Sequence, residues 1–411
     1  MEAIFYITQV ILTLFTLYYF LVSLFGFWHK REGYLLPPQS RFAIVIAAHN
    51  EEKVIGALIR NLMSLDYPKE LYRIFVVADN CTDSTAQIAA SLGANVIARF
   101  NPIERGKGYA LEYAFNKIFS KGDKFDAVVV FDADNLVSTN FLSIMNNRLL
   151  KGESIIQGYL DTKNADDTWI TKSIYIGYLL TNRFWQLSKY NLGLTCALGG
   201  TGMCLSVDVL KKYGWGMTSL TEDLEFQTKA LLNNLRVTWA HEAKVYDEKP
   251  LDLMQSWRQR KRWMQGHCNV AGRYLWTLLR EGVRNRSFVM IDGAIYLFQP
   301  FFLMFCGLSL LNNIFFMPDR IMEQPAWVAA GFLGQFFYFG LGLALERVRF
   351  KIYGWLIFYP VFALSWIPVA FAGYVFRNNK EWSHTTHIRS IRHENLENYY
   401  LPAKANGRKT G

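Results

Sequence analysis

Charged side chains are scarce in this chain of 411 residues, in which only 19% are Asp, Glu, Lys or Arg and 51% are hydrophobic. That balance excludes intrinsic disorder, because a disordered chain lacks the apolar side chains to build a core. The five cysteines are scattered and include no Cys-x-x-Cys pair, which argues against a disulfide scaffold or a structural zinc site. Lys and Arg outnumber Asp and Glu by 44 to 34, but nucleic-acid binders are seldom this apolar, so no nucleic-acid partner is expected.

Four long stretches lack charged side chains altogether and predict membrane helices. They cover residues 3–28, 293–318, 326–345 and 352–376. About 20 apolar residues in a helix span the roughly 30 Å hydrocarbon core of a bilayer. The first stretch could be a signal peptide, but its apolar part is too long and no small-residue cleavage site is evident, so we expect an anchor.

Positive charge gathers beside these apolar stretches. Residues 258–286 hold eight Lys or Arg and one acid, and the tail 377–411 holds seven and three. Such clusters are typical of segments that face anionic lipid headgroups or the cytoplasmic leaflet. We therefore expect a multi-pass protein of the plasma membrane with a cytoplasmic central domain and membrane lipids as partners. Charges that serve only solubility are the alternative.

Between the first two apolar stretches, short apolar runs alternate with helical patterns. Strands are predicted at residues 42–48, 73–78, 95–100 and 126–131. This alternation predicts an α/β domain with a mostly parallel sheet covered on both faces, whose ligands would bind beyond the carboxyl ends of the strands. The expected order is an N-terminal membrane helix (1–30), this domain (31–257), basic interfacial helices (258–287), a transmembrane region (288–376) and a basic tail (377–411).

Acidic side chains end two of the predicted strands. Asp79 follows one strand, and Asp132 and Asp134 follow another, so all three would project into one crevice. Two carboxylates one residue apart can share a divalent cation with phosphate oxygens, since Mg²⁺ and Mn²⁺ prefer oxygen ligands. An ordinary loop is the alternative for a bare Asp-x-Asp pair, and the buried strand before it favours the metal site.

Three turns carry candidate ligands for a phosphate-containing substrate. Glu51 lies in the turn after the first strand, although this turn could instead cap the next helix. Lys107 lies between two glycines that let the backbone approach a phosphate closely, or that merely cap a helix. A glycine-rich loop contains Thr201 and Gly202 and would admit a ligand, unless it is a plain turn.

Two later motifs carry acidic, basic and aromatic groups. Glu222 and Asp223 precede a helical pattern, where Thr221 could instead cap the helix and the two acids serve only the helix dipole. Gln259, Arg262 and Trp263 lie at positions i, i+3 and i+4 and so share one helix face. This face would offer an amide, a guanidinium for phosphate and an indole for stacking, unless the helix only contacts lipid.

The order of these motifs resembles the membrane-embedded family 2 glycosyltransferases, which include the cellulose, chitin, hyaluronan and poly-N-acetylglucosamine synthases. The matching set is Asp79, the Asp-x-Asp pair at 132–134, the Thr-Glu-Asp motif at 221–223 and the Gln-x-x-Arg-Trp motif at 259–263, followed by apolar stretches. The resemblance covers about residues 40 to 390 and implies a GT-A-like, Rossmann-like domain. It also implies a UDP-sugar donor, Mg²⁺ or Mn²⁺ as cofactor and a polysaccharide or glycolipid acceptor, and it leaves room for an accessory subunit.

The resemblance implies a role for each matching residue. The nucleotide-sugar would be bound by Asp132, Lys107 and Glu51, with Asp79 at its uridine and Arg262 at its diphosphate. Asp132 and Asp134 would hold the metal, and Asp223 would be the general base with Glu222 beside it. Those assigned to the acceptor are Trp263, Gln259, Thr201 and Gly202. The chain departs from the family in having Ala78 before Asp79, where two acids are common.

The tail contains a segment similar to the one that closes over the nucleotide in these synthases. Its candidate gating residues are Trp382, Thr385 and His387, with His387 in place of the usual base. A gate must be cytoplasmic, whereas a first helix followed by three full spans would place the tail outside. We therefore expect one apolar stretch to be interfacial or re-entrant, broken at a proline; otherwise the segment is not a gate.

Three functions remain open from the sequence. The favoured one is inverting, metal-dependent and processive extension of a β-linked polysaccharide that passes through the helices of the chain. The second is non-processive transfer to a lipid or glycolipid. A catalytically inactive transporter or adaptor is less favoured, because it would have lost the acids Asp79, Asp132, Asp134 and Asp223.

Overall fold

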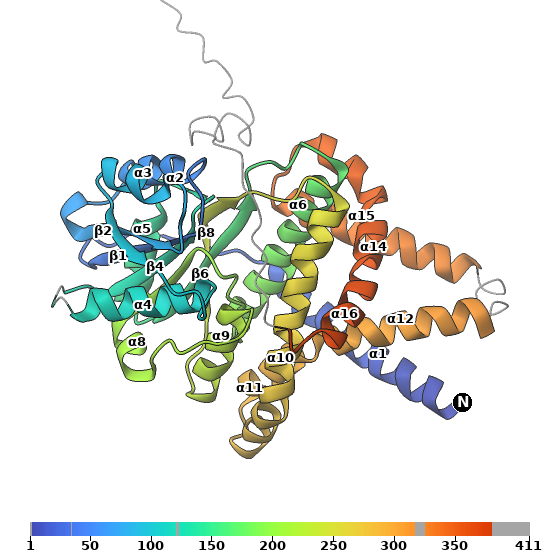
Figure 1. Cartoon of the computed structure of the whole chain (residues 1–411). Helices are drawn as coiled ribbons and strands as arrows, with labels where there is room; N and C mark the ends of the chain where they lie inside the picture. Colours follow the sequence, from blue (N-terminus) through green and yellow to red (C-terminus); the bar gives the residue numbers. More distant parts are fainter. Residues whose placement is uncertain (1, 34, 121, 123, 317–324, 380–411) are drawn as a thin grey trace, which may run out of the picture.

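A computed structural model describes residues 2–33, 35–120, 122, 124–316 and 325–379. In these residues an eight-stranded sheet has the strand order β3-β2-β1-β4-β7-β6-β8-β5. Helices cover the sheet, and long apolar helices project from one side of this domain (Figure 1). The predicted α/β class with a mostly parallel sheet is confirmed.

One half of the sheet is entirely parallel. Its strands are β1 (Phe42–Ala48), β2 (Tyr72–Asp79), β3 (Asn95–Arg99) and β4 (Ala127–Asp132). These are the four predicted strands, with ends that differ from the prediction by one residue at most. Their Val and Ile side chains favour strands because branched side chains pack well on a pleated surface.

The other half of the sheet mixes directions. Its strands are β5 (Leu136–Val137), β6 (Ile155–Thr162), β7 (Met203–Ser206) and β8 (Thr238–Asp247). β7 runs antiparallel to β4 and β6, β6 and β8 are parallel, and β5 is antiparallel to β8. β7 therefore places the loop before it beside the carboxyl end of β4.

Helices cover both faces of the sheet. One face carries α2 (Ile55–Met63), α3 (Thr85–Ser91) and α5 (Phe141–Leu150), and the other carries α4 (Lys107–Ser120), α8 (Val207–Tyr213) and α9 (Glu222–Leu232) (Figure 1). Alternate residues of β1 face the two layers: Ile44 clusters with Leu58, and Val45 with Leu111. All four side chains are fully buried, and each such burial stabilises the fold by roughly 1.5–3 kcal/mol.

A single long helix, α10 (Leu253–Arg284), leads from the last strand to the apolar helices (Figure 1). Asp252 caps it, because its carboxylate accepts a hydrogen bond from the backbone N of Gln255 at 2.8 Å. The shorter helices of the domain are η2 (Lys69–Leu71), α6 (Trp169–Thr181), the π-helix η3 (Asn182–Leu187) and α7 (Ser188–Asn191).

The apolar helices hold the candidate membrane spans. They are α1 (Glu2–Ser23), η1 (Leu24–Phe27), α11 (Phe288–Leu297), α12 (Gln299–Phe316), α14 (Pro325–Leu345), η4 (Phe350–Ile357), α15 (Tyr359–Leu364) and α16 (Trp366–Val375). The segment Tyr6–Phe27 is long and apolar enough to span a membrane. The pair α11 and α12 bends by 51°, and η4 bends by 56° against the helices after it. Among the described residues there is thus one candidate span, or three if each bent pair is one broken span.

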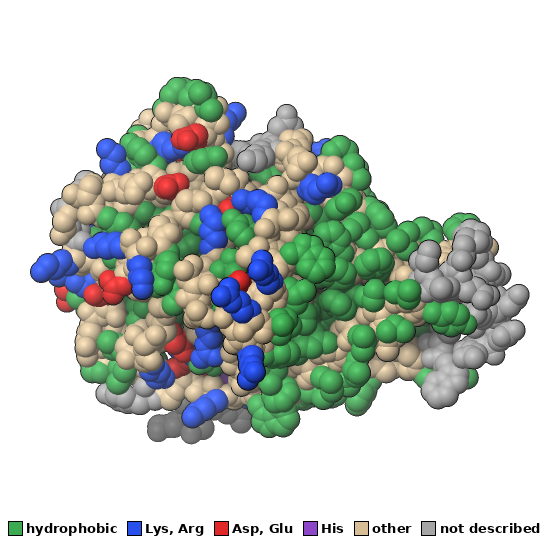
Figure 2. Space-filling model, turned by 90° about the horizontal axis from the view of Figure 1, so that it is seen from below, with side chains coloured by type: hydrophobic (Ala, Val, Ile, Leu, Met, Phe, Trp, Pro, Cys, Tyr) green, Lys and Arg blue, Asp and Glu red, His purple; other side chains and the backbone are tan. Residues whose placement is uncertain are grey.

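Both bends lie next to a proline. Phe298 separates α11 from α12 just before Pro300, and Phe358 separates η4 from α15 just before Pro360. Proline lacks the N–H that would continue the helix. Figure 2 shows hydrophobic side chains gathered over the half of the face that holds these helices, with Lys and Arg on the other half and along the boundary. This distribution indicates association with a membrane.

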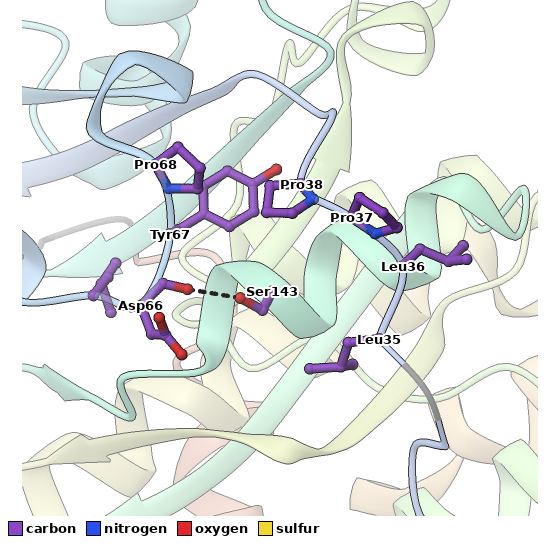
Figure 3. A pocket seen from close by; sticks show the side chains of 9 residues that line it. Leu35, Leu36, Pro37, Pro38, Asp66, Tyr67, Pro68 and Ser143 are labelled. Atoms are coloured by element: carbon purple, nitrogen blue, oxygen red, sulfur yellow. Dashed lines mark hydrogen bonds between the residues drawn. The ribbon is translucent and has the colours of Figure 1, made fainter.

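A hollow of about 520 Å³ lies at the amino ends of the strands (Figure 3). Its lining includes Pro37 and Pro38, which precede β1, and Tyr67 and Pro68, which precede β2. Tyr67 donates a hydrogen bond to the backbone oxygen of Ser40 at 2.8 Å. Because mostly parallel sheets bind ligands at the carboxyl ends of their strands, this hollow is separate from the predicted site.

Candidate active site

Charged side chains from separate segments meet at the carboxyl end of β4. Asp132 is the last residue of β4, and Lys107 begins α4. The Lys107 ammonium is ion-paired with Asp132, donates a hydrogen bond to the backbone oxygen of Gly200 at 2.7 Å, and lies 4.0 Å from Oε1 of Glu222. Burial alone would lower the pKa of Lys107, but Asp132 and Glu222 raise it, so this residue stays positively charged.

Glu222 and Asp223 occupy the first turn of α9. Thr221 precedes them, but its buried hydroxyl makes no hydrogen bond to any described residue, so a side-chain cap does not explain the motif. Burial and the charge of Glu222 raise the pKa of Asp223 to about 7. Burial also raises the pKa of Glu222, against the opposing effect of Lys107. A carboxylate with a pKa near 7 is suited to accept a proton at neutral pH.

The pKa of Asp223 predicts the pH profile of a reaction in which this carboxylate acts as a base. Because the pKa is raised, the carboxyl group is protonated below about pH 7 and gains its charge as the pH rises. We expect turnover to rise from about pH 6 to about pH 8 and then to level off. Glu222→Gln removes a negative charge beside Asp223 and should move this rise to lower pH. A flat profile, or one that Glu222→Gln leaves in place, would contradict this role.

The glycine-rich loop before β7 approaches the charged cluster through its backbone. Gly200 has a φ of +75°, a conformation that favours glycine. A methyl group at this position would lie 3.4 Å from Oδ2 of Asp223 and 3.7 Å from Nζ of Lys107. Gly200 is therefore the member of this loop that borders the charges, and the glycine pattern was its signal in the sequence.

Thr201 and Gly202 support the end of β4. The Thr201 hydroxyl accepts a hydrogen bond from the backbone N of Asp132 at 3.1 Å and donates one to Asn135. Gly202 has a φ of +63°, and a methyl group there would lie 2.7 Å from the side chain of Val245. Their predicted contact with an acceptor stays a prediction, and the structure adds a supporting role for both.

Asp79 lies at the same edge of the sheet, farther along it. It ends β2, which β1 separates from β4, and it lies two residues beyond the position level with Asp132, so the two Cα atoms are roughly 12 Å apart. Its carboxylate is ion-paired with Arg99 at 2.6 Å, and both residues are buried. Glu51 follows β1, the strand between them, and its backbone N donates to the Thr85 hydroxyl at 2.8 Å. Arg99 was missed in the sequence, where its position at the end of β3 was the available signal.

Asp134 is buried next to a carboxylate that the sequence motifs did not include. It accepts a hydrogen bond from the backbone N of Glu248 at 2.8 Å, which places it beside Asp247, the last residue of β8. One oxygen of Asp247 is paired with Lys249 at 2.6 Å. The other, Oδ1, is buried and makes no hydrogen bond to the described part of the chain. Burial and the nearby charge of Asp134 raise the pKa of Asp247, against the effect of Lys249.

These acids offer the type of ligand that a divalent cation requires. Asp132, Asp134 and Asp247 supply carboxylate oxygens, and the buried oxygen of Asp247 lacks the partner that a cation would provide. Among the described residues, no three His, Cys, Asp or Glu side chains already converge as ligands, and Asp132 is paired with Lys107. The carboxylate type of these donors fits Mg²⁺ or Mn²⁺, whereas their arrangement in the described residues is not that of a preformed metal site. Asp247 ends a buried strand as Asp132 does, and that position was its signal.

The Gln-x-x-Arg-Trp motif lies on α10, with Arg262 near the acidic cluster. Arg262 is close enough to Glu222 to oppose the rise in the pKa of that residue. Trp263 stacks near Trp366 of α16, with ring centroids 6.4 Å apart and planes inclined by 21°. Gln259 is half-buried one turn before Trp263. The structure thus brings the Arg262 guanidinium to the acidic cluster, whereas the printed contact of Trp263 is with α16. The predicted gating residues Trp382, Thr385 and His387 lie outside the described residues.

Curated relatives share moderate sequence identity with the chain. It is 28% identical to the probable glycosyltransferase YdaM of Bacillus subtilis, over 67% of this chain and 66% of the relative. It is also 28% identical to the beta-monoglucosyldiacylglycerol synthase of a Nostoc species, over 59% of this chain and 53% of the relative. Identity to the poly-beta-1,6-N-acetyl-D-glucosamine synthase of Staphylococcus epidermidis is 23%, over 66% and 64%. The matched part therefore spans between about half and two thirds of each relative.

A solved structure shows the same fold. The mannosyltransferase PcManGT from Pyrobaculum calidifontis, in complex with GDP-Man and Mn²⁺, superposes with a TM-score of 0.56 at 16% identity, over 90% of this chain and 99% of that one. This likeness confirms the predicted GT-A-like fold. Residues 37–266, more than half of the chain, match the family described as Glycosyltransferase like family 2. The chain therefore belongs to family 2 of the glycosyltransferases.

Proposed function

We propose that the chain transfers a sugar from a UDP-sugar, with inversion, to a growing β-linked polysaccharide at the membrane. The observation that carries this proposal is the meeting of Asp223, Lys107 and Asp132, with Arg262 of α10 close to Glu222. An inverting transfer needs a base, cationic groups for the diphosphate and a surface for the acceptor sugar. The base and the cationic groups meet at the carboxyl end of β4, and the proposed acceptor surface is the Gln259 and Trp263 face of α10.

Asp223 would act as the general base. The acceptor hydroxyl oxygen attacks the anomeric carbon and forms the new bond, while its proton passes to the Asp223 carboxylate. The bond between the anomeric carbon and the diphosphate oxygen breaks on the opposite face, and UDP leaves with the electron pair. An α-linked donor therefore gives a β-linked product. A pKa of about 7 leaves much of Asp223 ionised at neutral pH and still basic enough for this step.

Lys107 and Arg262 would neutralise the departing diphosphate. Lys107 is held by a backbone oxygen and by Asp132, so its charge is in place before the substrate binds. Asp132, Asp134 and Asp247 would hold Mg²⁺ or Mn²⁺, which when bound supplies further positive charge to phosphate oxygens. Fixed charges of this kind stabilise the transition state without reorganising during the reaction.

Asp79 and Arg99 would bind the base of the nucleotide. They form a buried ion pair, and the Cα atom of Asp79 lies roughly 12 Å from that of Asp132, which leaves room for a ribose between the base and the diphosphate. A carboxylate can accept the N3–H of uracil as it can the N1–H of guanine, so the UDP donor rests on the family resemblance. PcManGT was solved with GDP-Man, so GDP-sugars are the donors with which UDP-sugars should be compared.

A lipid or glycolipid acceptor is the second candidate. The observation that favours it is the apolar surface beside α10, where Trp276 is 76% exposed. One relative is named for a glucosyldiacylglycerol product and another for a polysaccharide.

If the acceptor is a growing polysaccharide, as we propose, Trp263 and Gln259 contact it. The polysaccharide then leaves through a multi-pass region of the plasma membrane, and the catalytic domain stays cytoplasmic.

Product length separates the two acceptors. The purified chain in lipid nanodiscs would be supplied with Mn²⁺ and radiolabelled UDP-glucose or UDP-N-acetylglucosamine. We expect polymers that grow with time and that β-specific glycosidases digest. A lipid of fixed mass carrying one sugar would establish the second candidate. A product that only α-specific glycosidases cleave would contradict inversion for either acceptor.

A further inference from the structure

A glycine lets α10 touch the loop that carries the acidic motif. A methyl group at Gly266 would lie 2.5 Å from both Oγ1 and Cγ2 of Thr221 and 2.8 Å from its backbone N. No side chain fits at such distances, so this approach requires glycine. Thr221 directly precedes Glu222 and Asp223. The position of the proposed base thus depends on contact with α10.

A second glycine lets α10 touch α16, an apolar helix, on another side. A methyl group at Gly373 would lie 2.3 Å from Cβ of Met264 and 3.1 Å from the backbone N of Gln265. The Gln265 amide also donates a hydrogen bond to the backbone oxygen of Phe376 at 3.0 Å. Residues 264–266 therefore lie directly between α16 and the catalytic loop.

The contact at Thr221 is held by packing. The Thr221 hydroxyl is buried and bonds to none of the described residues, so close fit rather than a side-chain hydrogen bond fixes it against Gly266. Close-packed interiors transmit displacements, because neither side has free volume to absorb them. A shift of α16 at Gly373 would therefore move residues 264–266 and, through them, the first turn of α9.

We infer that Gly266 and Gly373 are positioning residues through which α16 supports the proposed base Asp223. The inference rests on the proposed function, because it concerns the placement of its general base. It makes turnover depend on packing among the apolar helices. Nucleotide binding depends on this packing less, since of the residues assigned to the nucleotide-sugar only Arg262 lies on α10, one turn before Gly266.

The test compares four alanine variants in nanodiscs. Gly266→Ala and Gly373→Ala place a methyl group in the two contacts. Gly272→Ala on α10 and Gly340→Ala on α14 are matched controls, because no described atom lies within 4 Å of the added methyl group. Alanine is a better helix former than glycine, so helix propensity does not disfavour any of the four. We expect the first two to lower kcat by roughly 10- to 100-fold, the cost of a small misplacement of reacting groups, and to change the Kd of UDP by less than about threefold.

Two further measurements separate positioning from general damage. Thr221→Ala removes two of the three atoms that a methyl group at Gly266 would meet, so Gly266→Ala/Thr221→Ala should regain part of the kcat lost. Amide hydrogen exchange in the first turns of α9, without substrate, should be faster in Gly373→Ala than in Gly340→Ala. This second readout needs no turnover.

Two outcomes would overturn the inference. In one, Gly373→Ala matches Gly340→Ala in both kcat and hydrogen exchange. In the other, the two test variants weaken UDP binding as strongly as they lower kcat, which would mean that they displace α10 with Arg262 as a whole and do not act through Asp223. Absence of transfer by the unmodified chain would instead contradict the proposed function, and the exchange comparison would still decide the inference.

Discussion

Asp223→Asn is expected to lower the rate of sugar transfer by about 10²- to 10⁴-fold, the range that a positioned general base contributes. Asparagine keeps the size of aspartate, but its amide cannot take the proton of the acceptor hydroxyl. Asp223 lies in the first turn of α9 and in the proposed mechanism contacts the acceptor rather than the nucleotide. UDP should therefore bind the variant with nearly unchanged affinity, as measured by calorimetry alongside turnover.

A matched control for this variant is Asp208→Asn. Asp208 is exposed and also lies in the first turn of a helix, α8, so the substitution makes the same change of charge away from the cluster. It should leave both transfer and UDP affinity unchanged. Full activity of Asp223→Asn would remove Asp223 from the role of base.

Lys107→Met is expected to lower kcat by about 10²- to 10³-fold and to raise the KM for the donor. Methionine keeps most of the apolar stem and removes a charge that pairs with Asp132 and faces Glu222. Loss of one preformed group that stabilises developing charge typically costs this much. Lys107 also lowers the pKa of Asp223, so its removal should move the rise in the pH profile to higher pH.

The control for Lys107→Met lies on the same helix. Lys117 of α4 is exposed, and Lys117→Met removes an equal charge about three turns farther along. Turnover and KM of this variant should stay within twofold of those of the unmodified chain. Near-normal kinetics of Lys107→Met would mean that the Lys107–Asp132 pair only stabilises the fold.

The parallel half of the sheet could be predicted because its signals are local. β1 and β4 are runs of Val, Ile and Ala or Phe bounded by polar turns, and their ends were placed within one residue. The mixed half could not be predicted in this way. β7 has four residues and pairs with β4 and β6, which are distant in the sequence, so its register depends on tertiary packing.

The site residues were predictable where a sequence motif places a charged side chain at the end of a strand or in the first turn of a helix. Lys107, Asp132, Glu222 and Asp223 were predicted from such motifs, and the structure brings them together. Asp247 and Arg99 were missed although each ends a strand, because no motif marks them and their contacts with Asp134 and Asp79 follow only from the tertiary packing. The importance of Gly266 depends on what lies opposite it, and a single sequence carries no sign of that contact.

The proposed inverting sugar transfer is tested most directly by measuring UDP release by the purified chain. The donors are a panel of UDP-sugars and GDP-sugars with Mn²⁺, and Asp223→Asn is the blank. We predict that at least one UDP-sugar gives UDP release together with incorporation of its sugar into a β-linked product. Asp223→Asn should give neither. Release of nucleotide only from GDP-sugars would contradict the proposed donor. Equal release by the unmodified chain and by Asp223→Asn would contradict the central claim that Asp223 is the base of an inverting sugar transfer.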